Sequence, residues 1–393
     1  MALRFNEVGM KYSSIERLHQ MWERRHPYNF VCVADVRMEV AAAELRRATT
    51  ETLAEFGLSD QDDSEDALEV IEVDDLEQHA IQELNARISK PVRLAVQRSQ
   101  ECAKDGVSRI AVAFRHLFFD GMNSMVFLRR VLRRASGDVL RPLELGPYLR
   151  GRDWLIANGF WRVPALFGRL AVDWFKMRRV YARGDGRESP EADATFVEVP
   201  TDLLGRLRRE GDRFGATIND VLIARTARAF VAIEACGPGR HSNIAVSMAV
   251  SLRNGIEPLN PGVCAASSAV FLRPGADILR DVQKQTLAMK RSRSYFRGLI
   301  GVGIGVRFWR DPGTGCRPSS AYVPSLGMTN VRVPLGPGDE LILRLRAVAA
   351  AGPVLPMLLV AVTHSDRMEL SLSWRRTLFF NDEIDILIRS LCE

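Results

Sequence analysis

The sequence contains no CxxC pair, the spacing that marks many zinc and redox sites. Small disulfide-stabilised proteins carry cysteines at high density, and this chain of 393 residues does not. We therefore expect neither a disulfide framework nor a zinc site, and we predict reduced intracellular thiols. The six cysteines are Cys32, Cys102, Cys236, Cys264, Cys316 and Cys392.

Histidine is also scarce, with six residues and no HxH or HxxxH pair. Such pairs place two imidazoles on one face of a strand or helix, where they can bind one metal ion. The sequence therefore predicts no metal site.

Long hydrophobic runs are missing. The longest uncharged stretch, residues 347–363, is interrupted by Gly352, Pro353 and Pro356, and is typical of a strand, a turn and a strand rather than a membrane span. The first residues reach charge at once and contain no apolar segment of a signal peptide. We expect a cytoplasmic protein.

A strong charge of either sign is missing as well. The formal net charge is +6, the difference between 54 basic and 48 acidic residues. This excess could favour acidic ligands, such as a phosphate-bearing cofactor or an acidic carrier protein, but it does not indicate nucleic acid. A hydrophobic content of 47% is that of a globular protein, and the length predicts two domains or one two-lobed unit.

Hydrophobic periodicity predicts a mixed α/β (α+β) fold, because neither half shows a regular strand–helix alternation. The expected domains are an N-terminal lobe over 1–145, a connector over 146–195 and a C-terminal lobe over 196–393. Strands are predicted over 29–40, 67–73, 92–99, 108–116, 194–200, 243–254 and 267–274, a hairpin over 358–374, and helices over 41–57, 123–137, 203–215, 217–235 and 381–393.

Residues 141–195 mix Gly, Pro, Trp and Arg, and we predict a partly helical connector there. Two interpretations stay open. The connector could pack across the two lobes, or its aromatic and basic side chains could touch a membrane surface or an acyl chain.

The stretch "RHLFFDG", residues 115–121, places His116 at the end of an apolar strand. Asp120 and Gly121 supply a turn, since glycine can adopt φ > 0, and the next helix is expected to be capped by Asn123 or Ser124. Histidine is the natural general base near neutral pH. A histidine at a strand end can equally be a packing residue, and the spacing alone leaves both interpretations open.

This stretch resembles the HHxxxDG signature of the CoA-dependent acyltransferase superfamily. That superfamily includes chloramphenicol acetyltransferase, peptide-synthetase condensation domains and wax ester synthase/diacylglycerol acyltransferases. Further segments resemble the wax ester synthase branch in the order expected there: "TINDVLIARTARAF" (217–230), "MAVSLRNG" (248–255) and "MTNVRVPLG" (328–336). The quoted segments span residues 115–336.

The resemblance implies two chloramphenicol acetyltransferase-like lobes that form a V around a central active-site tunnel. It implies acyl transfer from acyl-CoA or a phosphopantetheine-linked thioester, used as co-substrate with no permanently bound cofactor. The implied partners are a small alcohol or amine acceptor and an acyl carrier protein. No nucleic acid is expected, and membrane contact would be at most peripheral.

The family's roles carry over where residues match. His116 would be the general base, and Asp120 would be structural and paired with an arginine. Arg253 is the candidate for that arginine, with a plain surface residue as the alternative. Gly121 would leave room for the acyl donor. In the second lobe, Asn219, Asp220, Thr329 and Asn330 would organise or contact the substrate, although Asn219 could be a helix cap and Asn330 a plain loop residue.

The sequence also departs from the family pattern. Arg115 replaces the first histidine of the signature, and Gly262–Val263 stands where a glycine–asparagine pair is expected. Two alternatives to acyl transfer therefore remain. The chain could bind an acyl carrier without turnover, or it could catalyse cyclisation, dehydration or epimerisation on a carrier-bound substrate.

Overall fold

The computed structural model describes most of the chain. The described residues are 13–24, 26–58, 70–97, 106–146, 159–177, 179–180, 191–233, 243–253, 259, 262–273, 275, 277–296, 298, 326–332, 336, 339–351 and 355–393.

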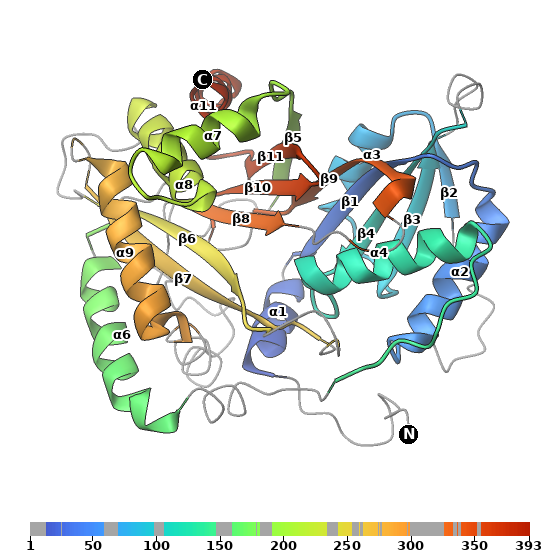
Figure 1. Cartoon of the computed structure of the whole chain (residues 1–393), viewed down its shortest axis with the longest axis horizontal. Helices are drawn as coiled ribbons and strands as arrows, with labels where there is room; N and C mark the ends of the chain where they lie inside the picture. The colour runs from blue at the N-terminus through green and yellow to red at the C-terminus, as the bar shows by residue number, and fades with distance from the viewer. Residues whose placement is uncertain are drawn as a thin grey trace.

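The N-terminal half forms a five-stranded mixed sheet in the order β2-β3-β4-β1-β9 (Figure 1). β4 is antiparallel to both β3 and β1, and β2 is parallel to β3. Its central strands are apolar and β-branched, as expected of strands buried on both faces. The strands are β1 (Asn29–Val36), β2 (Val70–Val73), β3 (Val92–Gln97), β4 (Ser108–Arg115) and β9 (Ile342–Ala349).

Helices cover both faces of this sheet. Helices α2 (Ala42–Glu55) and α4 (Gly121–Ala135) pack against one face, where Phe114, Phe119 and Phe127 form an aromatic cluster. Helix α3 (Leu76–Glu83) covers the opposite face. Both faces of β1 and β4 are therefore buried, and β4 delivers the residue after it to a fixed place.

The C-terminal half forms a six-stranded sheet in the order β5-β11-β10-β8-β6-β7. Helices α7 (Leu203–Asp212), α8 (Ile218–Ala232), α9 (Ile278–Ser292) and α11 (Asn381–Cys392) pack on one face. Helix α6 (Val163–Met177) packs on the other face at β6 and β7. The strands are β5 (Ala192–Val197), β6 (Ile244–Ser251), β7 (Ala265–Leu272), β8 (Leu326–Arg332), β10 (Met357–His364) and β11 (Arg367–Arg375).

One strand crosses between the halves. β9 comes from the expected C-terminal lobe by sequence, yet it pairs with β1 at the edge of the first sheet. The boundaries 1–145, 146–195 and 196–393 therefore describe the chain order, while this element belongs to the sheet of the other lobe. The lobe boundaries themselves stay a prediction.

Helix α4 starts two residues before its predicted start. Helix α4 begins at Gly121 and its N-cap is Asp120, so the predicted caps Asn123 and Ser124 are wrong. Asp120 fits this position because its carboxylate accepts two backbone N–H groups of the first turn. Helix α11 begins at Asn381, where the predicted range begins.

Helix α1 (Ser14–Glu23) lies at the junction of the two sheets (Figure 1). No helix of the described chain combines the length and the apolar character needed to cross a bilayer.

Candidate active site

His116 follows β4 directly, and two backbone contacts fix its position. Its N–H donates to the carbonyl oxygen of Tyr28 at 3.1 Å. Its ring atom Nδ1 lies 2.9 Å from the carbonyl oxygen of Phe119. A carbonyl oxygen can only accept, so this contact requires the proton on Nδ1 and leaves a lone pair on Nε2. The local turn therefore selects the tautomer that a general base needs.

Three aromatic rings hold the imidazole in place. Tyr28 stacks on it with 5.0 Å between ring centroids and an interplanar angle of 7°. Phe30 meets it edge-on at 5.1 Å, and the ring of His19 lies 4.5 Å away. The side chain is partly rather than fully buried. It is thus rigidly placed and still open to a reactant.

Burial lowers the pKa of His116 below its ordinary value of 6.5, although the charge of Asp120 opposes this shift. Desolvation disfavours the imidazolium more than this carboxylate favours it. The ring is therefore neutral at physiological pH, which is the state in which it can accept a proton.

Helix α1 supports this site, and the sequence analysis did not predict the helix. Nδ1 of His19 donates to the backbone carbonyl oxygen of His116 at 2.8 Å. Burial and the neighbouring His116 place the pKa of His19 well below 6.5. The helix carries a capping box between Ser13 and Glu16. This Ser-x-x-Glu spacing is the sequence signal that could have revealed the helix.

Asp120 joins the two halves of the molecule. Arg253, which follows β6, places Nη1 2.9 Å and 2.6 Å from the two carboxylate oxygens. Both side chains are almost fully buried, with 3% of Arg253 and 5% of Asp120 exposed. The backbone N–H of Cys264 also donates to this carboxylate at 2.8 Å. The expected pairing of Asp120 with Arg253 is therefore present, and the carboxylate is saturated with donors.

Arg253 is held charged in this setting. Burial alone would lower its pKa, but the adjacent carboxylate of Asp120 outweighs burial, so the pKa lies above the ordinary value. Its Nη2 donates to the carbonyl oxygen of Gly262 at 3.0 Å, which also accepts from the side chain of Asn123 at 3.1 Å. Gly262 has φ +79°, a conformation that favours glycine. This backbone conformation explains why glycine is kept in the Gly262–Val263 pair, although the second residue differs from the family pattern.

The second residue of that pair contacts α1. The N–H of Val263 donates to Glu16 at 3.3 Å. Burial raises the pKa of Glu16, although its backbone hydrogen bonds oppose the shift. The junction beside His116 therefore contains α1, α4 and the segment after β6, bound through backbone groups and through the Asp120–Arg253 ion pair.

Gly121 serves close packing rather than a special backbone angle. Its φ is not positive, so the expected left-handed turn is wrong. It is the first residue of α4 and faces β8 of the other half. A Cβ placed on it would lie 2.9 Å from Cγ2 of Val331, closer than real Cβ contacts. Glycine is required because α4 and β8 approach each other here.

The predicted substrate contacts of the second lobe fall on two faces of β8. Asn330 donates to the side chain of Asn219 in the first turn of α8, so these two residues are brought together. Thr329 is the neighbour of Asn330 along the strand and points to the opposite face, the face of Val331. Thr329 therefore shares the face that approaches α4, and the two asparagines do not.

Helix α8 is capped by Thr217, so the alternative role of Asn219 as a cap is wrong. Asp220 accepts from the backbone N–H of Thr217 at 2.8 Å and from the hydroxyl of Thr286 at 2.7 Å. It ties α8 to α9 and holds the start of α8 in place. Asp220 thus organises the second lobe, as expected, without reaching the His116 ring.

Comparisons with known proteins find similar folds among solved structures. No protein-family model matches the chain, and no curated protein matches it. Among solved structures, the condensation domain of the monacolin K polyketide synthase MokA has a TM-score of 0.67 at 14% identity, covering 97% of this chain and 95% of that chain. TRI3 trichothecene 15-O-acetyltransferase from Fusarium sporotrichioides has a TM-score of 0.66 at 11% identity, covering 99% and 96%.

The chain has the condensation-domain fold. The epimerization domain from the third module of tyrocidine synthetase B shares it, with a TM-score of 0.62 at 12% identity over 97% of this chain and 94% of that chain. At such identities the likeness establishes the two-lobed, chloramphenicol acetyltransferase-like architecture that was expected from the sequence. The likeness to the wax ester synthase branch stays a prediction.

Within the condensation-domain fold, Arg115 has a structural place of its own. Its guanidinium binds the carboxylate of Glu23 in α1 at 2.8 Å and the carbonyl oxygen of Ser89 at 3.0 Å. It also lies over the ring of Phe118, 5.1 Å from the centroid. Arg115 therefore fastens α1 beside the site.

Proposed function

We propose that this chain is an acyltransferase that moves an acyl group from a thioester to a hydroxyl or amine, with His116 as the general base. The observation that carries this proposal is the hydrogen bond from Nδ1 of His116 to the carbonyl oxygen of Phe119, which leaves a lone pair on Nε2. The fold, shared with condensation domains and an acetyltransferase, supports the reaction class.

The proposed reaction needs one base and no covalent enzyme intermediate. The acceptor O–H or N–H donates to Nε2 of His116, and its heteroatom attacks the thioester carbonyl carbon. The proton moves to Nε2 as a tetrahedral intermediate forms. The C–S bond then breaks, the imidazolium returns the proton to the departing sulfur, and an ester or amide and a free thiol leave.

Asp120 does not take part in proton transfer in this proposal. Its carboxylate already accepts from Arg253, Cys264 and the first turn of α4. It positions the turn that carries His116, and its charge moderates the lowering of the His116 pKa. Thr329 is the second-lobe hydroxyl that we assign to substrate contact. Asn219 of α8 and Asn330 of β8 bind each other on the opposite face of the strand, and we assign them to a separate substrate contact there.

We propose acyl-CoA or an acylated carrier protein as the donor. The positive net charge suits CoA phosphates or an acidic carrier surface. The condensation domains that share the fold come from synthases and synthetases, which favours a carrier thioester.

The test is release of free thiol from a panel of acyl-CoAs and acyl-pantetheine carriers, with pooled alcohols and amines. His116→Ala is expected to lower the acceptor-dependent rate by roughly 10²–10⁴-fold. His79→Ala is the matched control, because His79 lies on α3 beside Glu83 and away from the site. Partial rescue of His116→Ala by added imidazole would identify a missing base rather than a collapsed site. Full activity in His116→Ala would refute the assignment.

A second candidate is proton removal from carbon on a carrier-bound substrate. The observation that favours it is the shared fold with an epimerization domain. Here His116 would take a proton from carbon and no thiol would be released. Deuterium uptake from heavy water into a carrier-bound acyl group, without thiol release, would select this reaction over acyl transfer.

A further inference from the structure

Helix α6 is anchored by one narrow stripe. The stripe recurs every three or four residues, so its members lie on one side of the helix. Its first half packs with Ile15 of α1, Leu252 and Cys264, and its second half packs with β6 and β7. The stripe consists of Val163, Leu166, Leu170, Asp173 and Met177.

The opposite side of α6 is apolar and exposed. Five large hydrophobic side chains on or just before the helix are 40–71% exposed. Pro164, Gly168 and Ala171 lie on the same side of the helix and carry no charge, so the apolar surface continues between the large side chains. Contiguous apolar patches on a protein surface mark contacts with partners or membranes. The large side chains are Trp161, Phe167, Val172, Trp174 and Phe175.

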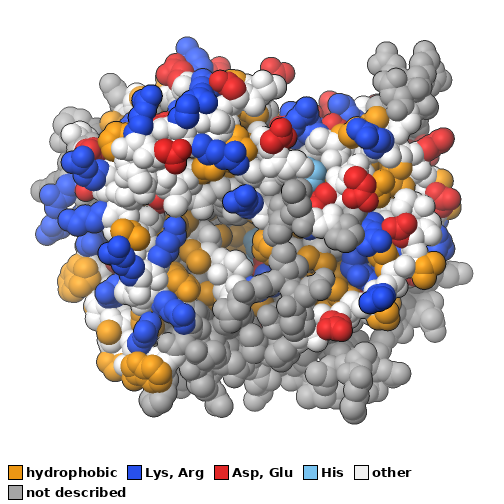
Figure 2. Space-filling view, viewed as in Figure 1, with side chains coloured by type: hydrophobic (Ala, Val, Ile, Leu, Met, Phe, Trp, Pro, Cys, Tyr) orange, Lys and Arg blue, Asp and Glu red, His pale blue; other side chains and the backbone are white. Residues whose placement is uncertain are grey.

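The exposed charges of α6 are all positive. The single carboxylate of α6, Asp173, is buried in the inner stripe. Arg162, Arg169 and Lys176 are exposed and follow each other at seven-residue intervals, which places them in a row along one flank. Figure 2 shows hydrophobic and basic side chains side by side over this region at the lower left.

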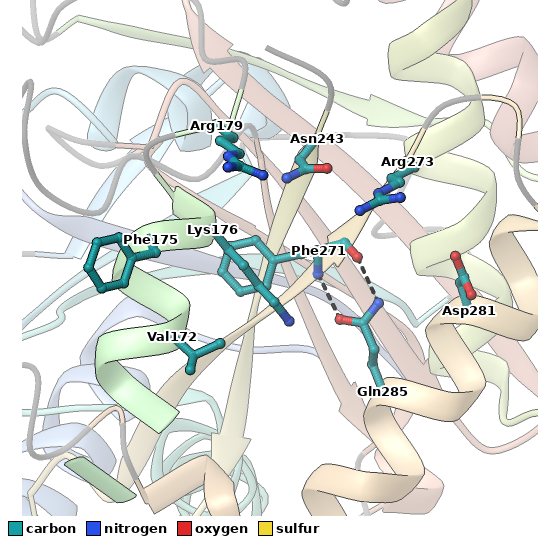
Figure 3. A pocket seen from close by; sticks show the side chains of 9 residues that line it. All are labelled: Val172, Phe175, Lys176, Arg179, Asn243, Phe271, Arg273, Asp281 and Gln285. Carbon is teal, nitrogen blue, oxygen red and sulfur yellow. Dashed lines mark hydrogen bonds between the residues drawn. The ribbon is translucent and has the colours of Figure 1, made fainter. Parts of the chain in front are cut away.

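A cavity of 710 Å³ adjoins the same flank, between α6, β7 and α9 (Figure 3). Lys176, Arg179 and Arg273 line it, against one carboxylate, Asp281. The side-chain amide of Gln285 fixes one wall of the cavity, because it accepts from the N–H of Phe271 at 2.9 Å and donates to the carbonyl oxygen of Phe271 at 2.7 Å. The cavity therefore offers excess positive charge beside an apolar surface.

We infer that α6 and this cavity form a docking surface for an anionic membrane. The apolar side of α6 enters the boundary between headgroups and acyl chains, and the flanking cations contact lipid phosphates. Aromatic side chains at the edges, such as Trp161 and Trp174, suit the interface between water and lipid. The inference is independent of the proposed function.

The shape favours a membrane over a protein partner. Helix α6 stands at the outer edge of the molecule (Figure 1), so its apolar side is a ridge rather than a groove. A fluid lipid layer accommodates a ridge without a complementary surface, whereas a protein partner would need a matching hollow. The charge of the described α6 surface complements anionic headgroups.

The experiment is sedimentation of the full chain with two kinds of vesicles, phosphatidylcholine alone and equal parts of phosphatidylcholine and phosphatidylglycerol. We expect binding to the anionic vesicles that weakens with salt. Phe175→Ser should lower the partition coefficient about tenfold through lost apolar burial. Lys176→Glu should lower it about thirtyfold, because the change removes one cation near the anionic surface and adds one anion.

Matched controls lie elsewhere on the surface. Phe380→Ser changes a phenylalanine that is 73% exposed, against 66% for Phe175. Arg47→Glu changes an arginine on α2, 58% exposed, on the other side of the molecule (Figure 1). Both controls should bind like the parent. All variants should keep the parent circular dichroism spectrum.

Several outcomes would overturn the inference. They are failure to bind anionic vesicles, equal binding to phosphatidylcholine alone, and unchanged binding by Phe175→Ser and Lys176→Glu. The surface would be assigned to a protein partner if no form of the chain bound vesicles and Phe175→Ser abolished binding of a carrier protein. This result would also overturn the inference.

Discussion

Arg253 binds both carboxylate oxygens of Asp120 across the junction of the two halves, through a single nitrogen, at 2.9 Å and 2.6 Å. The pair is nearly free of solvent contact. Replacement of either residue leaves the charge of the other buried without a counterion. The stability lost in this way is much larger than the stability that the ion pair itself contributes.

A double-mutant cycle tests this relationship. Asp120→Asn and Arg253→Met should each lower the free energy of unfolding by about 3–5 kcal/mol, because each leaves one buried charge behind. The double variant should lose less than the sum, since neither charge remains. Urea unfolding followed by circular dichroism measures all four free energies. Additive losses would show that the two residues act separately.

Gly121 offers a suppressor test of the contact between α4 and β8. Gly121→Ala should destabilise the protein by about 1–3 kcal/mol, because the added methyl group meets the stiff side chain of Val331. Val331→Ala removes the obstructing methyl groups. The double variant should therefore unfold at a higher temperature than Gly121→Ala alone. No recovery in the double variant would argue against the close approach.

Arg115→His restores the first histidine of the HHxxxDG pattern. The change removes the ion pair with Glu23 and the contact with Phe118. We expect about 1–3 kcal/mol of lost stability, from the charged hydrogen bonds to Glu23 and Ser89. Under the proposed mechanism, acyl transfer measured below the unfolding temperature should keep its kcat, because His116 is unchanged. A large rise in kcat would instead give the first histidine a chemical role.

The pH profile of activity reports the state of His116. Because its pKa lies below 6.5, kcat/KM should be flat at neutral pH and fall only as pH drops below about 6.5. Stability should change in the same direction. In the unfolded chain His116 takes up a proton near the ordinary histidine pKa, while in the folded protein its ring stays neutral. Unfolding therefore binds protons, and the free energy of unfolding decreases as the pH is lowered. A midpoint above 6.5 in kcat/KM would contradict the buried, neutral base.

Local patterns allowed much of the fold to be predicted from the sequence. The apolar run of β4, the periodicity of α8 and the β10–β11 hairpin are all encoded within short windows of the chain. The pairing of β9 with β1 is not, because the paired residues Phe30 and Ala349 are far apart in sequence. Helices α3 and α9 were missed, since their polar residues obscure the apolar stripe.

The site divides in the same way. His116, Asp120 and Arg253 could be named because the resemblance supplies a pattern for them. His19 and Glu16 could not, since they reach the site only through the folding of α1 against the junction. The distribution of Thr329 and Asn330 on two faces of β8 required the strand register.

The pairing of β9 with β1 also constrains how the chain can be made. When the ribosome has synthesised β1 to β4, β1 can pair with β4 on one side, but its other side is an open, largely apolar edge until residue 349 has emerged. Exposed edges of this kind recruit other chains, and contacts between such distant residues form slowly. The N-terminal lobe expressed by itself would carry this open edge permanently. The first sheet is therefore complete only when a strand from near the C-terminal end of the chain has paired with it.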